Sequence, residues 1–136
     1  MVALRVLVLL TASFAANAGN LVSAIHIVSF DYPLISQLMA KQGTVELVLL
    51  VAPDGAVRSA RTVSGDAILA MRAGKALMDW RFSPCTSDRG ECEYPMSIQF
   101  VLKGAPVKAT ECKTQFQFNN PGRIVVTSQP ALAIRD

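Results

Sequence analysis

A hydrophobic period of two along residues 44–51 constrains the fold more than any other feature of this 136-residue chain. Apolar residues alternate there, which predicts a β-strand, and the second face also becomes apolar towards residue 51, so we expect a central strand. Pro53, Asp54 and Gly55 follow as a turn signal, and residues 56–63 are then the returning strand of a hairpin. An antiparallel sheet is therefore the expected framework.

Two helices are predicted around this hairpin. Asp31, Tyr32 and Pro33 mark the start of the first, because proline suits the first helical position and aspartate suits the positive end. We expect its apolar residues, which recur at helical spacing before a stop at Gln42 and Gly43, to form one buried face: Leu34, Ile35, Leu38 and Met39. The second helix is expected over residues 67–79, with an apolar face of the same period.

A third strand over residues 96–102 completes the pattern. Helix, strand, strand, helix and strand, joined by short connections, favour an α+β two-layer sandwich. We expect a three-stranded antiparallel sheet with two helices on one face. Residues 21–30 are expected to form a short strand or an extended lead-in, and residues 80–84 an extended segment. The tail contains two further strand candidates, residues 114–118 and 123–127, so a fourth C-terminal strand stays open.

The first 18 residues have the order of a secretory signal peptide, with a positive charge at Arg5, an apolar run and a small-residue cleavage site at Ala18. A membrane anchor is the alternative, but polar residues interrupt the run before the roughly 20 apolar residues that a span needs. We expect a periplasmic protein, or one anchored in the inner membrane if the segment is not cleaved. The expected division is a signal peptide at 1–18, a short lead-in at 19–31, one domain at 32–102 and a C-terminal extension at 103–136.

The composition excludes several classes of function. Without Arg5 the formal net charge falls from +3 to +2, and the basic residues are scattered, which does not suit nucleic-acid binding. The chain has a single histidine, His26, and no arrangement of nucleophile and base or phosphate-binding glycine loop. We therefore expect no enzyme, no catalytic residues, no metal site and no cofactor.

Three cysteines in an exported chain favour a disulfide. Cys85 and Cys92 bracket a short polar loop, and a bridge between them would stabilise the fold by about 2.5 kcal/mol in the chain-entropy model. The other pairings stay open, and an unpaired Cys112 would allow a cross-linked homodimer. A zinc site made from the cysteines and His26 has suitable ligand types but lacks the close spacing of structural zinc sites.

Several landmarks occur in a recognisable order: Tyr32-Pro33, Gly43-Thr44-Val45, Asp54-Gly55-Ala56-Val57, Ala76, Trp80-Arg81-Phe82-Ser83-Pro84 and the strand that ends near Phe100. In these features residues 32–102 resemble the C-terminal domain of TonB family energy transducers. The resemblance implies a protein-binding domain that contacts outer-membrane transporters in energy-coupled transmembrane transport. A structural envelope domain of the same fold, with no role in energised uptake, is the alternative.

The resemblance also implies a binding site. In TonB proteins the last strand accepts an extended segment of the transporter as an additional strand. On this chain the corresponding edge is Met96, Ser97, Ile98, Gln99, Phe100 and Val101. The Tyr-Pro neighbourhood, here Ser29, Tyr32 and Pro33, would contact the transporter as well. Ser29 replaces a glutamine that is frequent in the family, which argues against a shared partner specificity.

Two departures from the family pattern matter. Full transducers have a long proline-rich spacer, whereas residues 19–31 contain no proline, so even an anchored domain would lie close to its membrane. The second departure is the tail. Residues 114–118 or 123–127 are hypothesised to pair with the edge of the third strand in place of a transporter segment, as a built-in cover.

Overall fold

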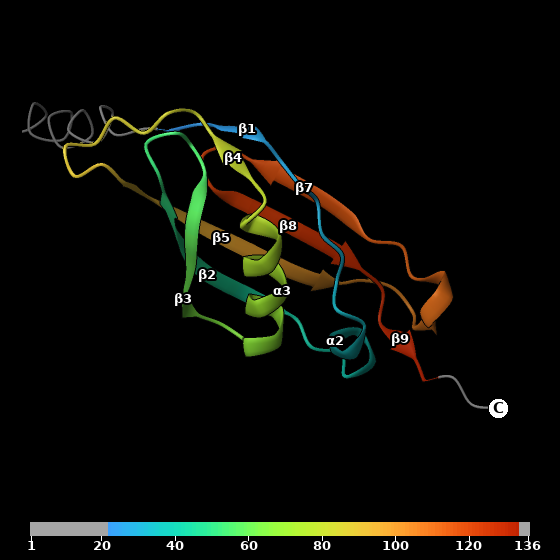
Figure 1. The fold of residues 1–136 in the computed structure, drawn as a ribbon. Coiled ribbons are helices and arrows are strands. Elements are labelled where there is room, and N and C mark those ends of the chain that lie inside the picture. Colours follow the sequence, from blue (N-terminus) through green and yellow to red (C-terminus); the bar gives the residue numbers. More distant parts are fainter. Residues whose placement is uncertain (1–21, 134–136) are drawn as a thin grey trace, which may run out of the picture.

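The computed structural model describes residues 22–133, so the predicted signal peptide lies outside the described residues. Its main sheet has five strands in the order β3-β2-β5-β8-β7, and Figure 1 shows them as one twisted layer. The bounds of these strands are Gly43–Val51 for β2, Val57–Ser64 for β3, Cys92–Leu102 for β5, Gln115–Asn119 for β7 and Arg123–Ser128 for β8.

The predicted hairpin forms β2 and β3, and β2 pairs with both β3 and β5, which confirms its central position. Gly55 makes the turn possible in two ways. Its φ is +91°, a region that side chains disfavour, and a Cβ there would lie 2.0 Å from the carbonyl oxygen of Phe82. The turn therefore packs directly against the strand that follows the second helix.

The prediction of a three-stranded antiparallel sheet is wrong. β5 begins at Cys92, four residues earlier than the predicted third strand, and the tail adds two more strands. After β5 the chain returns along β7, reverses through residues 120–122, and places β8 between β5 and β7. Because of this reversal β8 runs parallel to β5, and the sheet is mixed.

The second predicted helix is confirmed as α3 (Ala67–Leu77). The Asp66 carboxylate caps its start by accepting hydrogen bonds from the backbone N–H groups of Ile68 and Leu69. The apolar face is buried as its period predicts, with Leu69, Ala73 and Leu77 inaccessible to solvent. This helix packs against β2 and β3.

The first predicted helix exists as α2 (Leu34–Leu38), but the predicted buried face is wrong. Its apolar side chains are 40–56 % exposed: Leu34, Ile35, Leu38 and Met39. The buried residues are instead Ser36 and Gln37. The reason lies in the tail, because Gln37 on the polar side of α2 donates hydrogen bonds to Ser128 at the end of β8 and to the next residue, Gln129.

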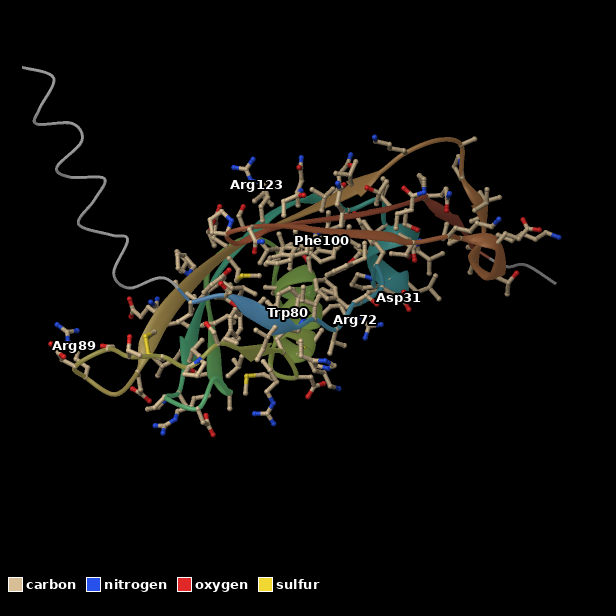
Figure 2. The ribbon with its side chains drawn as sticks, turned by 90° about the horizontal axis from the view of Figure 1, so that it is seen from above. Asp31, Arg72, Trp80, Arg89, Phe100 and Arg123 are labelled. Carbon is tan, nitrogen blue, oxygen red and sulfur yellow. A yellow bond between two sulfur atoms is a disulfide. The ribbon has the colours of Figure 1, made fainter. Side chains whose placement is uncertain are left out.

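Short strands complete the fold. β1 (Ala24–His26) pairs with β4 (Arg81–Phe82), and β6 (Val107–Lys108) pairs with β9 (Ala131–Leu132), with a 3-10 turn at Ala109–Glu111 between β6 and β7. Trp80 and Phe100 point into the core between the sheet and the helix layer, whereas Arg123 points away from it (Figure 2). Within residues 22–133, no helix has the length and apolar character needed to cross a membrane.

Candidate partner-binding edge

The sequence-predicted edge lies in the second half of β5. Met96, Ile98 and Phe100 point into the core and are buried, while Ser97, Gln99 and Val101 lie on the outer face of the sheet. On one side, β5 pairs with β2 along all nine residues of β2. The other side is where a further strand could add.

That second side holds the chain's own β8. The two strands pair in parallel from Ser97 opposite Arg123 to Leu102 opposite Ser128. On the core face, Ile124 lies beside Ile98 and Val126 beside Phe100, and both aliphatic side chains are inaccessible to solvent. The edge that the family resemblance assigns to a partner is thus filled by a strand of the C-terminal extension.

Polar contacts fix both ends of β8. Just before β8 starts, the N–H of Ser97 donates to the carbonyl oxygen of Gly122 at 2.8 Å. At the last residue of β8, the carbonyl oxygen of Ser128 accepts from the N–H of Lys103 at 2.8 Å. Gln37 on α2 is 4 % exposed, and its Nε2 donates to Ser128 Oγ at 2.9 Å and to the Gln129 carbonyl at 3.0 Å. A buried side-chain amide therefore holds the end of the added strand.

Aromatic rings cover the core side of β8. Val126 lies between Phe100 of β5 and Phe116 of β7, and the ring of Phe30 is 6.2 Å from the first and 5.1 Å from the second, centroid to centroid. Phe118 of β7 contacts Trp80 edge-on at 5.1 Å. The extension is therefore packed into the same core as the rest of the fold.

The Tyr-Pro region lies next to this edge. The Tyr32 ring contacts Phe100 edge-on at 5.2 Å, and the Tyr32 hydroxyl donates to the Lys41 carbonyl. Burial, with a smaller contribution from the negative charge of Asp66, raises the pKa of Tyr32 to about 12, so the hydroxyl stays protonated. Tyr32 and Pro33 are buried, whereas Ser29 is exposed.

The predicted disulfide is present between Cys85 and Cys92, whose Cα atoms are 5.9 Å apart. It uses two of the candidate zinc ligands, so the alternative of a zinc site made from the three cysteines does not apply. Within residues 22–133, no three or more histidine, cysteine or acidic side chains are grouped to hold a metal ion. The bridge links Cys85 to Cys92, the first residue of β5, and so lies at the end of β5 that does not pair with β8.

Sequence reasoning missed the residues that hold the extension. Gln37 sits in a helix whose apolar residues drew attention to the opposite face. Ile124 and Val126 alternate along the strand predicted at residues 123–127, and Ser128 continues that period of two one residue beyond it. The period is a signal for one buried face. Nothing in the local sequence specified that this face would lie against β5.

Known proteins are similar to the first part of this chain, up to the end of β5. The family described as the Gram-negative bacterial TonB protein C-terminal matches residues 28–102, more than half of the chain. The chain belongs to this TonB C-terminal family. No curated protein matches it. Among solved structures, the solution NMR structure of the Pseudomonas aeruginosa TonB C-terminal domain is similar, with 17 % identity and a TM-score of 0.46, over 57 % of this chain and 83 % of that one.

The family match ends at Leu102, the last residue of β5. β8, β7 and both strands of the β6–β9 pair therefore lie beyond the residues that the family model matches. The family is one of transducer domains rather than of enzymes. In this member, the last strand of the TonB C-terminal region is followed by a segment of the same chain that pairs with it.

Proposed function

We propose that this chain is a periplasmic protein-binding domain of the TonB type, which contacts an outer-membrane transporter by strand addition at the β5 edge. Family membership supports the role in energy-coupled transport. The observation that carries the proposal is the pairing of residues 97–102 with a strand laid along them. This pairing supports the view that the backbone groups and the core face of the β5 edge can accept an extended segment.

β8 then controls access to the edge. A partner must replace the burial of Ile124 and Val126, and each such side chain contributes about 1.5–3 kcal/mol. The tethered strand also competes at a high effective concentration. We propose that transporter binding and docking of β8 exclude each other, so that the extension sets a threshold for partner affinity.

The membrane relation follows from residues 1–18. If they are cleaved, the domain is free in the periplasm and transmits no force by itself. If they remain, it is held at the inner membrane facing the periplasm. Mass spectrometry of the purified protein distinguishes these states, because a mature N-terminus at Gly19 supports the first and an intact Met1 supports the second.

A structural envelope domain without transport function is the second candidate, because the β5 edge is already occupied by β8. The two functions predict different peptide binding once the docking of β8 on β5 is weakened. The test uses the full chain, its Val126→Asp variant with a charge on the core face of β8, and a matched Val125→Asp variant on the outer face. Binding is measured by fluorescence anisotropy with labelled peptides from the periplasm-facing segments of outer-membrane transporters.

The transport proposal predicts that Val126→Asp binds such a peptide at least about tenfold more tightly than the unchanged chain, a difference of about 1.4 kcal/mol. Val125→Asp is expected to behave like the unchanged chain. Ile124→Ser is a second released variant should the aspartate prevent folding, which circular dichroism reports. A folded, released variant that binds none of the transporter segments would reject strand addition and favour the structural domain.

A further inference from the structure

β8 shows which side chains the β5 edge accepts. Its inward-facing residues lie in a row beside those of β5, with Ile124 opposite Ile98 and Val126 opposite Phe100, and both are inaccessible to solvent. Phe30 contacts the two rings that flank Val126 in the sheet, those of Phe100 and Phe116. At these two positions a polar side chain would lose its hydration without a partner, so the site selects aliphatic residues.

A glycine is needed where the added strand begins. Gly122 lies so close to β5 that a Cβ there would be 2.4 Å from the carbonyl oxygen of Pro95. That oxygen belongs to the backbone and cannot rotate away. The pairing with β5 starts one residue later, at Arg123 opposite Ser97. Any side chain at the position of Gly122 would push the start of the strand away from β5.

The far end of the strand meets a buried polar site on α2. Gln37 donates to the hydroxyl of Ser128, which is 2 % exposed, and to the next backbone carbonyl. The neighbouring Ser36 is 1 % exposed, and its hydroxyl has no hydrogen-bond partner within residues 22–133. An apolar residue in place of Ser128 would leave the Gln37 amide without one acceptor in a buried place.

The outer face of β8 makes no comparable demand. Arg123 is exposed, and Val125 and Thr127 are half-buried beside Ser97, Gln99 and Val101 of β5. Selection thus comes from alternate residues only. This spacing is expected when one face of an added strand meets the core and the other meets solvent.

We propose that the β5 edge, Phe30 and Gln37 together form a sequence-selective site for an extended peptide. The preferred segment runs parallel to β5 and carries a glycine, aliphatic residues two and four positions later, and a serine six positions later. Residues 122–129 are the chain's own example of this segment. For the identity of the partner, the inference rests on the proposed function: the transporter segment that displaces β8 carries the same pattern.

The test measures binding of a peptide with the sequence of residues 122–129 to the full-length Val126→Asp protein. The unchanged peptide is expected to bind and to raise the melting temperature in a concentration-dependent way, since it binds only the folded protein. A peptide with serine in place of Val126 is expected to bind at least about tenfold more weakly. The matched control has serine in place of Val125 and is expected to bind as the unchanged peptide does. Equal weakening by the two changes would overturn the proposal.

A second measurement does not depend on a destabilised receptor. Hydrogen exchange of the full chain is compared with that of its Gln37→Ala variant, in which α2 keeps its exposed apolar face. Amides of residues 123–129 are expected to exchange about tenfold faster in the variant, the size expected for a lost buried hydrogen bond. Amides of β2 and β3 are expected to be unchanged. Unchanged exchange in residues 123–129 would remove Gln37 from the site.

Binding of transporter segments to the Val126→Asp protein distinguishes a failure of this inference from a failure of the proposed function on which it rests. If the peptide of residues 122–129 binds Val126→Asp and no transporter segment does, the selective site stands and the transport function fails. If transporter segments bind at the β5 edge without regard to the pattern, the function stands and the selective site is overturned. Binding ranked by the match to the pattern supports both.

Discussion

β5 divides the sheet into two sides that are built differently. On the hairpin side, defined as β2, β3 and α3, the strands are antiparallel and follow one another closely in the chain. On the extension side, defined as β8, β7, β9 and α2, a parallel strand arrives after a reversal of the chain. The hairpin side lies within the family match and β8 lies beyond it. The comparison teaches that the edge of the strands within the family match can be filled by a later segment of the same chain.

The largest effect is expected from a charge on the extension side. Val126 is inaccessible to solvent, so Val126→Asp places a carboxylate where it has neither water nor a partner, at a cost of about 3–5 kcal/mol in the free energy of unfolding. Val125→Asp, on the outer face, is expected to cost less than about 1 kcal/mol. Urea unfolding measures both. If both variants lose a similar free energy of unfolding, the face of β8 that carries Val126 does not lie in the core.

The two helices offer the next comparison. Leu77 of α3 is inaccessible to solvent, and Leu77→Ala is expected to lower the free energy of unfolding by about 3 kcal/mol because it leaves a cavity. Ile35 of α2 is 49 % exposed. Ile35→Ala is expected to change the free energy of unfolding by less than about 1 kcal/mol. Thermal unfolding of the two variants checks this. A large loss at Ile35 would restore the buried face that the sequence predicted.

Removing the disulfide tests the hairpin side, because Cys92 pairs with Val51 at the end of β2. Replacing Cys85 and Cys92 by serine is expected to lower the free energy of unfolding by about 2.5 kcal/mol, since the unfolded chain gains freedom. Cys112→Ser, at the free and half-buried cysteine, serves as the control and is expected to stay within about 0.5 kcal/mol. If the control loses as much as the double variant, the assigned bridge does not hold in solution.

The smallest effect concerns the cap of α3. Backbone hydrogen bonds, foremost that from Leu69, together with the charge of Lys41, lower the pKa of Asp66 in the folded state. Its contribution is therefore complete above the pKa of the unfolded chain and is lost as the pH falls through the lower folded value. Asp66→Ala is expected to cost about 1 kcal/mol near neutral pH. The difference from the unchanged chain should shrink below about pH 4, and a difference that grows there would contradict the assignment.

Local signals predicted the hairpin side well. The Pro53-Asp54-Gly55 turn, the apolar period of α3 and the short loop between Cys85 and Cys92 each depend on residues close in sequence. The extension side could not be predicted to the same degree. Its strands were recognised as candidates, but the parallel position of β8 depends on contacts with β5 that lie far apart in the sequence. The buried face of α2 could not be predicted for the same reason, because Gln37 donates its hydrogen bond to Ser128, 91 residues later in the chain.

The central claim is that β8 occupies the β5 edge in parallel. Solution NMR of the full chain tests it through nuclear Overhauser contacts between the two strands. We predict contacts that advance in the same direction along both, joining Ile98 to Ile124 and then Phe100 to Val126, together with slow amide exchange along residues 97–102. An absence of these contacts, with rapid amide exchange throughout residues 123–128, would mean that the edge is open and would contradict the account.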